Sequence, residues 1–184
     1  IPLKVRGNGS FEQQGTLAIS NGGEVDIEST TFVHDGLTIQ SGDAPIFVAN
    51  GAIQYLGGFH EGDLFARFAE LDLQSADGSA LVRVQGDSTA SAITDADFTV
   101  SVEGNDTVGV GTGSLEFLQP QTVTGDIVLT STGGNRFAQL IFPNGTTTFA
   151  PTSTIYVLDG EGGPRRFVTA SGNKTVDIQG TLNI

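Results

Sequence analysis

The chain has 184 residues, which is enough for one domain or two small ones, and its 21 acidic and 8 basic residues give a net charge of −13. A chain this acidic repels nucleic acid and anionic lipid, so neither is expected as a partner. There is no cysteine, which excludes disulfide and thiolate chemistry, and no apolar stretch approaches the roughly 20 residues of a membrane-spanning helix.

The N-terminal residues alternate apolar and basic side chains, from Leu3 to Arg6, before the turn Gly7-Asn8-Gly9. This alternation predicts an edge strand or a half-buried strand. We expect residues 1–9 to form an extended arm that pairs either with its own sheet or with a neighbouring subunit. A basic strand is attracted to an acidic surface in a salt-sensitive way. The candidate interface residues are therefore Leu3, Lys4, Val5 and Arg6. Because the chain begins at Ile1, we also expect a processed or trimmed product.

Short apolar runs separated by Gly, Asn, Asp or Pro continue through the chain, which is typical of short strands joined by tight turns. Residues 17–20 and 25–27 flank Asn21-Gly22-Gly23, a favourable hairpin turn. A strand–turn–strand unit then recurs, and its copies start at Leu37, Leu71, Phe98, Ile127 and Ile155. A loose period of roughly 30 residues, as these starts have, indicates a repeated supersecondary unit.

Two architectures fit this pattern. We predict a single all-β domain over residues 1–184, an antiparallel β-sandwich or barrel (jelly-roll-like) built of repeated hairpins. The alternative is a β-solenoid in which each of the five units is one rung. The sandwich or barrel is preferred because the units share no ladder of identical Asn or aromatic positions.

Residues 61–71 depart from the strand pattern. Apolar side chains at 64, 65, 68 and 71 have helical spacing, and Asp63 precedes them as a candidate N-cap. Read as a strand, the same segment places Leu64, Ala66 and Phe68 on one face. We therefore expect either one short helix or a buried strand here.

The residue types that carry catalysis form no recognisable motif. His34 and His60 each stand beside an acid, but histidines in turns are usually solvated. No Gly-x-Ser-x-Gly elbow or phosphate-binding loop occurs, and 21 acids do not single out a glycosidase pair. The sequence therefore predicts a protein without enzymatic activity.

Carboxylates gathered in Gly-containing turns offer the oxygen ligands that calcium prefers, although their spacing matches no EF-hand loop. No cofactor is expected apart from calcium. The candidate metal ligands are Asp95, Asp97, Glu103, Asp106, Asp159 and Glu161.

The C-terminal third of the chain carries a family resemblance. FPNGTTTF, STIYVLDGEGG and RFVTASGNKTVDIQGTLNI follow one another between residues 142 and 184. This order resembles repeats of bacteriophage virion proteins, namely tail-fibre, spike and head-fibre chains. The resemblance covers about residues 120–184 and implies a structural or attachment role in a homo-oligomer outside the cell.

Together these observations predict a non-enzymatic structural protein of an extracellular or virion assembly, such as a fibre, spike, decoration or filament subunit. Its partners would be further copies, other virion or surface proteins, and a host-surface glycan. One alternative is a carbohydrate-binding or polysaccharide-degrading fibre domain. The lack of Trp and the presence of only Tyr55 and Tyr156 weaken that alternative, because sugar sites usually stack on these rings. A second alternative is a secreted cell-surface adhesin.

Overall fold

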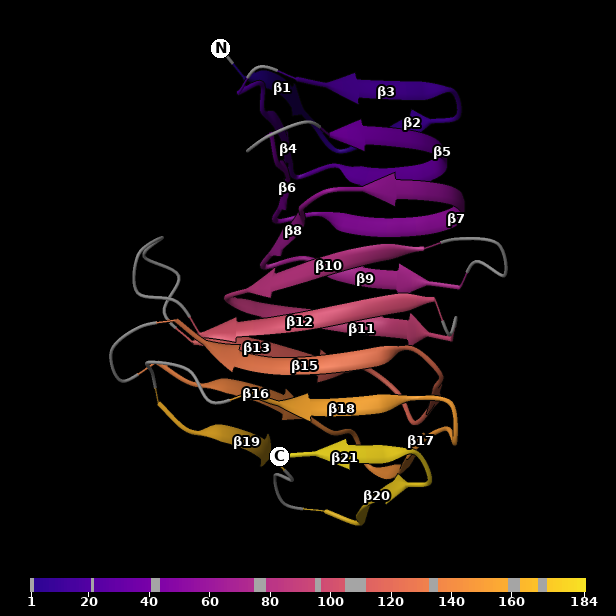
Figure 1. The fold of residues 1–184 in the computed structure, drawn as a ribbon, viewed down its shortest axis with the longest axis vertical. Helices are drawn as coiled ribbons and strands as arrows, with labels where there is room; N and C mark the ends of the chain where they lie inside the picture. Colours follow the sequence, from indigo (N-terminus) through magenta and orange to yellow (C-terminus); the bar gives the residue numbers. More distant parts are fainter. Residues whose placement is uncertain are drawn as a thin grey trace.

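The protein is an elongated stack of β-strands with the two termini at opposite ends (Figure 1). The computed structural model describes residues 2–20, 22–40, 44–74, 79–94, 97–104, 112–132, 136–158, 163–168 and 172–184. All regular elements in these ranges are strands, which confirms the all-β prediction. Within these ranges there is no helix that could cross a membrane.

The strands form three sheets. The first sheet has the order β1 (Leu3–Arg6), β4 (Val25–Glu28), β6 (Ile46–Ala49), β8 (Leu64–Arg67), β10 (Ala80–Gln85), β12 (Phe98–Gly104), β15 (Asp126–Ser131), β18 (Thr154–Val157) and β21 (Thr181–Asn183). The second has the order β19 (Arg165–Val168), β16 (Ala138–Ile141), β13 (Gly113–Phe117), β11 (Asp87–Ile93), β9 (Glu70–Leu73), β7 (Ala52–Glu61), β5 (Thr31–Gln40) and β2 (Ser10–Gln13), with β3 (Thr16–Ile19) also pairing with β5. The third joins β14 (Thr122–Val123), β17 (Gly145–Phe149) and β20 (Lys174–Ile178).

Every pairing between the described strands is parallel, so the predicted antiparallel sandwich or barrel of repeated hairpins is wrong. The strands that flank the expected first hairpin, β3 and β4, belong to different sheets. The alternative, a β-solenoid with five units as rungs, is also wrong, because each large sheet contains nine strands. After a tight turn, an amphipathic strand can form a hairpin with the preceding strand or enter the opposite sheet. The local sequence pattern is the same in both cases.

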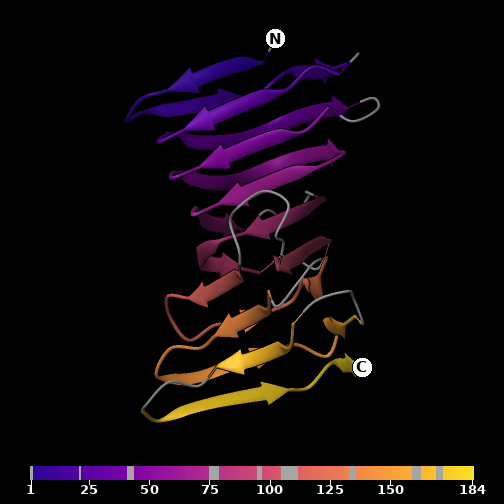
Figure 2. The same cartoon turned by 90° about the vertical axis from the view of Figure 1, so that its left-hand side faces the viewer.

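Each turn of the stack, by which we mean one passage of the chain through both large sheets, lies beneath the preceding one (Figure 2). In the N-terminal half the turns are short, since Val25 pairs with Ile46 and Ile46 pairs with Leu64. In the C-terminal half they are longer, as in the pairing of Ile127 with Ile155, because each turn there also supplies a strand to the third sheet. The predicted period thus matches the C-terminal turns alone.

The core is built from columns of inward side chains in register. One column of the first sheet runs through Val25, Ile46, Leu64, Val82, Val100, Ile127 and Ile155, which are all at most 3% exposed. A column of the second sheet begins with Phe11 stacked on Phe32 and continues through Ile53 and Leu71. Each column removes apolar surface from water on every turn, so the hydrophobic contribution grows with the number of turns.

Residues 61–71, where a helix was one alternative, form two strands with a corner between them. β8 ends at Arg67, Phe68 has a positive φ of 51°, and β9 begins at Glu70. Leu64 and Ala66 are buried, as the strand alternative predicted, but Phe68 points out at 47% exposure. Tertiary pairing with β6 and β10 overrides the helical spacing of the segment.

Candidate functional sites

The predicted N-terminal arm pairs within its own chain on one side. β1 pairs with β4, and Lys4 and Arg6 make surface ion pairs with Asp26 (3.7 Å) and Glu28 (2.9 Å). The other side of β1 is the free edge of the first sheet. Since the Leu3 N–H donates to the Glu24 carbonyl, the alternating N–H groups of Lys4 and Arg6 face this free edge. The candidate interface residues therefore sit where a further strand would pair.

The predicted calcium ligands divide between described and undescribed parts of the chain. Asp95, Asp106, Asp159 and Glu161 lie outside the described residues. Asp97 is exposed in the turn before β12. The described residues contain no group of three or more His, Cys, Asp or Glu side chains that could hold a metal ion.

Glu103, the remaining predicted ligand, is buried on the outer face of the first sheet. Its carboxylate accepts hydrogen bonds from Arg83 Nη1 (2.8 Å) and Gln85 Nε2 (3.2 Å). Arg83 Nε also contacts Asp63 at 2.7 Å. Because the side chain of Glu103 is only 6% exposed, the guanidinium of Arg83 supplies the charge that balances it.

The two histidines lie inside the molecule, contrary to the expectation for turn residues. His34 in β5 and His60 in β7 are 0% and 4% exposed, and their ring centres are 5.6 Å apart. His34 also stacks on Tyr55 at 4.3 Å. These rings form a polar patch in the interior where the long strands β5 and β7 bend.

Burial and the hydrogen bonds together favour the neutral form of both imidazoles. His34 Nδ1 donates to the Gly57 carbonyl (2.9 Å), so its Nε2 accepts from the Thr38 hydroxyl (3.1 Å). Gln40 Oε1 accepts from the Asp63 N–H, so the amide nitrogen of Gln40 donates to His60 Nε2 (2.9 Å). Burial lowers the pKa of His60 to about 3, and repulsion by a protonated His34 would act in the same direction. Burial also lowers the pKa of His34. Both rings are thus buried, with nearly all of their surface removed from solvent.

The C-terminal end of the stack leaves large apolar side chains exposed. Phe167, Leu182 and Ile184 are 36%, 42% and 91% exposed and line a hollow of 270 Å³ with Leu129, Val157 and Arg165. Arg165 Nη1 donates to the Gly163 carbonyl, but its Nε and Nη2 are buried without a hydrogen-bond partner in the described residues. An exposed apolar surface of this kind is a feature of contact surfaces between proteins.

A corner in the backbone repeats along the N-terminal half of the stack. The residue after each of β4, β6, β8 and β10 has a positive φ, between 51° and 76°. These residues are Ser29, Asn50, Phe68 and Gly86. Asn and Gly adopt this left-handed conformation readily. For a bulky residue the same conformation costs on the order of 1–3 kcal/mol of strain. Phe68 is thus the unusual member of the series.

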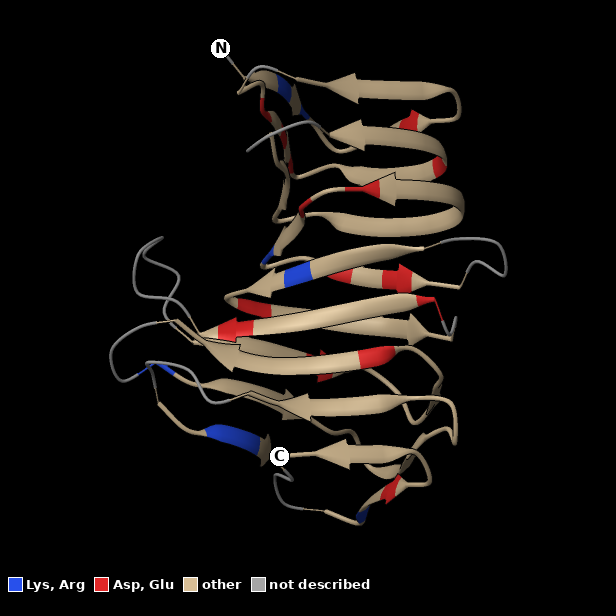
Figure 3. Cartoon of the chain, in the orientation of Figure 1, with Lys and Arg blue, Asp and Glu red and all other residues tan. Residues whose placement is uncertain are grey.

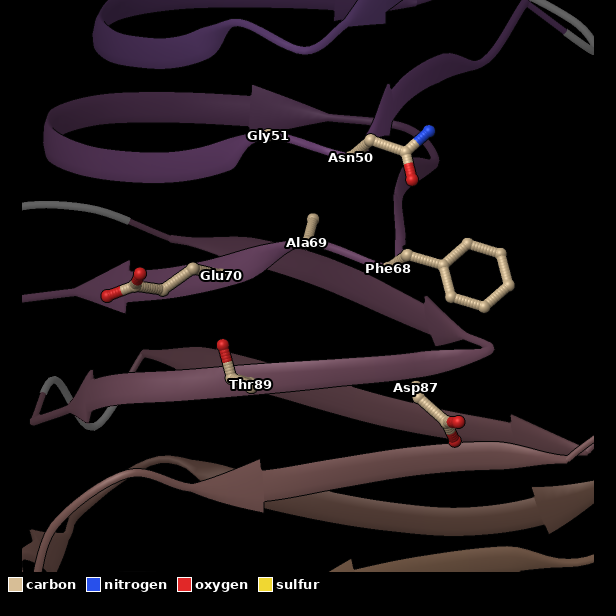
Figure 4. A pocket seen from close by; sticks show the side chains of 7 residues that line it. All are labelled: Asn50, Gly51, Phe68, Ala69, Glu70, Asp87 and Thr89. Carbon is tan, nitrogen blue, oxygen red and sulfur yellow. The ribbon is translucent and has the colours of Figure 1, made fainter.

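The ring of Phe68 rests on the next turn of the chain. A Cβ atom on Gly86 would lie 2.8 Å from Cε1 and Cζ of Phe68, so only glycine admits the ring there. The ring borders a hollow of 390 Å³ between successive corners (Figure 4). The residues lining this hollow, which we call the corner hollow, are Asn50, Gly51, Phe68, Ala69, Glu70, Asp87 and Thr89.

The polar side chains of the corner hollow are available for binding. Asn50, Glu70 and Asp87 are exposed, and within the described residues no hydrogen bond or ion pair engages the side chains of these residues or of Thr89. Asn50 and Asp87 lie above and below Phe68 along the stack, with Glu70 and Thr89 farther along the strands (Figure 4). The site therefore combines an aromatic surface, two carboxylates, an amide and a hydroxyl.

The sequence patterns alone do not predict the corner hollow. Its members come from three different turns, and their proximity depends on parallel pairing. One sequence pattern could have indicated the corners. Asn50, Phe68 and Gly86 are evenly spaced in the chain, and each directly follows an alternating strand.

Comparisons with known protein families, with characterised proteins and with solved structures find no match for this chain.

Proposed function

We propose that this protein is a non-enzymatic structural subunit that assembles with further copies of itself through the two ends of the stack. The observation that carries the proposal is the direction of the free edges. The first sheet ends in β1 on one side and β21 on the other, and all its strands are parallel. The β1 edge of one copy can therefore continue the sheet that ends in β21 of another without reversing strand direction.

Both ends offer apolar surface next to these edges. Leu3 is 52% exposed at the N-terminal end, and Leu182 and Ile184 are exposed at the C-terminal end. A contact between two different ends of identical molecules is heterologous and does not close on itself unless the rotation forms a ring. Repetition of this contact would give a rod or a fibre.

Basic residues occur near both ends of the stack (Figure 3). Lys4 and Arg6 already pair with Asp26 and Glu28 on the surface, and such exposed pairs contribute little. The proposed contact consequently depends on strand pairing and apolar burial more than on charge, and its salt dependence should be weak.

The setting in an extracellular or virion assembly is part of the proposal and rests on the resemblance of residues 120–184 to phage fibre and spike chains. The proposed lack of catalysis rests on the sequence, which has no catalytic motif. Incubation with neutral and acidic surface polysaccharides should release no reducing ends. Turnover that disappears in Asp97→Asn would instead make the protein a hydrolase.

A proline in β1 tests the assembly. Lys4→Pro removes an N–H that faces the free edge and leaves the hydrogen bond from Leu3 to Glu24 in place. The matched control is Lys4→Ala, which loses the same ion pair but keeps the N–H. Deleting residues 1–9 is a poorer test, because it would uncover the edge of β4 as a new free edge.

We expect wild type and Lys4→Ala to form oligomers and Lys4→Pro to shift toward monomer, with the same β-type circular dichroism for all three. Light scattering at several salt concentrations measures the mass, and electron microscopy shows whether the assembly is linear. Equal masses for Lys4→Pro and Lys4→Ala would exclude this edge as the contact.

A further inference from the structure

We propose that the corner hollow binds a neutral sugar, with the ring of Phe68 as the stacking surface. This site is separate from the ends of the stack, so it does not depend on the proposed assembly. It is formed by three successive corners, at Asn50-Gly51, Phe68-Ala69 and Asp87.

The aromatic ring of Phe68 occupies an unusual place for its residue type. The fold accepts Ser, Asn or Gly at the equivalent corners, yet position 68 has a Phe in the same left-handed conformation. One part of the ring packs against Gly86, and 47% of the residue remains exposed toward solvent. An apolar flat surface is therefore held rigidly at the edge of the hollow, where the apolar face of a sugar ring can stack.

The hydrogen-bonding groups around that ring include both donors and acceptors. Glu70 and Asp87 are acceptors, whereas the Asn50 amide and the Thr89 hydroxyl each donate and accept. A sugar hydroxyl also donates one hydrogen bond and accepts others. A ligand with several hydroxyl groups satisfies this mixed set.

Charge decides between classes of sugar. Two carboxylates in the hollow, on a chain with net charge −13, oppose uronic acids and other anionic sugars. An organic cation would match the carboxylates and the ring, but it would leave the donors of Asn50 and Thr89 unused. Exposed carboxylates also attract a cation weakly through water. The site therefore fits an uncharged pyranose better than either charged class.

The shape of the hollow sets the expected affinity. It is an open depression of 390 Å³ on the surface, lined by seven residues. A ligand there stays partly in contact with water, so we expect millimolar affinity for a monosaccharide. Several sites along an assembled rod would raise the apparent affinity for a polysaccharide through multivalency.

The decisive variant is Phe68→Asn, because Asn50 shows that the same corner of the preceding turn accepts Asn. Asn tolerates a positive φ, so this variant relieves backbone strain while it removes the ring. The matched control is Phe59→Asn, which removes another half-exposed Phe (49% exposed) that does not line the hollow. A second variant, Glu70→Gln with Asp87→Asn, keeps the ring and alters only the acceptors.

The experiment is an NMR titration of amide shifts with glucose, galactose, mannose and N-acetylglucosamine, with glucuronate and tetramethylammonium as charged probes. We expect at least one neutral sugar to shift residues 50, 68, 70, 87 and 89. Phe68→Asn should weaken this binding about tenfold or more, the carboxylate double variant should also weaken it, and Phe59→Asn should leave it unchanged.

Three results would overturn the proposal. The first is a lack of shifts with all four neutral sugars. The second is a response to tetramethylammonium alone, which would make the hollow a cation site. The third is unchanged sugar binding in a folded Phe68→Asn variant; if that variant does not fold, unchanged binding by the carboxylate double variant decides against the site.

Discussion

The buried histidine pair makes the stability of this protein fall in acid, and replacing His60 should remove a large part of that dependence. In the unfolded chain His60 has a pKa near 6.5, whereas burial lowers it to about 3 in the folded protein. Above pH 6.5 the imidazole is neutral in both states and adds no pH dependence. Below that pH the unfolded chain takes up a proton that the folded protein does not, so the free energy of unfolding decreases.

The magnitude follows from the width of this window. Each pH unit between 6.5 and 3 removes about 1.4 kcal/mol, so His60 alone destabilises the fold by about 3 kcal/mol at pH 4.5 and by about 5 kcal/mol in full. The local reason is that protonated Nε2 would face the amide N–H of Gln40, which leaves two donors in contact. The lowered pKa of His34 adds in the same direction.

The test is urea unfolding of wild type and His60→Gln by circular dichroism at intervals from pH 7.5 to pH 3.5. A Gln side chain can keep an acceptor toward Gln40 but cannot titrate. The difference in free energy of unfolding between the two proteins should shift in favour of the variant as pH falls, and the carboxylate contributions cancel in that difference. Parallel pH profiles across the whole range would refute the argument that His60 is buried as a neutral ring.

Two further predictions concern packing and charge. Gly58→Ala should destabilise far more than Gly22→Ala: both have a positive φ, but a Cβ on Gly58 would lie 1.8 Å from the Gly36 carbonyl oxygen and one on Gly22 meets nothing within 4 Å. Thermal unfolding should show roughly 1 kcal/mol for Gly22→Ala and a several-fold larger loss for Gly58→Ala; equal losses would contradict the backbone contact. Arg83→Met should lower the free energy of unfolding by about 2–3 kcal/mol, because Glu103 is left buried without a counter-charge. This loss is somewhat smaller than for a fully buried pair, because the side chain of Arg83 is 35% exposed. Arg6→Met, whose partner Glu28 is 45% exposed, should cost less than about 1 kcal/mol, and similar losses for both variants would argue against a buried Glu103.

The candidate sites divide according to how far apart their residues stand in the chain. The strand Leu3–Arg6, the candidate interface, was recognisable because its alternation is local, and it does form an edge strand. The corner hollow was not recognisable, because Asn50, Phe68 and Asp87 become neighbours only when successive turns stack. The histidines were misplaced for the same reason: the sequence shows His34-Asp35-Gly36 as a turn, but β5 continues through it and pairs with β7.

The sequence by itself determined that the chain is made of strands, because the alternation of apolar and polar residues and the turn residues between them act over a few positions. In β4, β6 and β8 this alternation matches the buried and outward positions of the structure. Only the tertiary structure decided that the strands are parallel, since a strand with one buried face has the same pattern whether its neighbour is the next strand or one that lies a full turn of the stack away. Pairing over that distance is fixed by the burial of whole columns, such as Val25 to Ile155, which no single segment of the sequence contains.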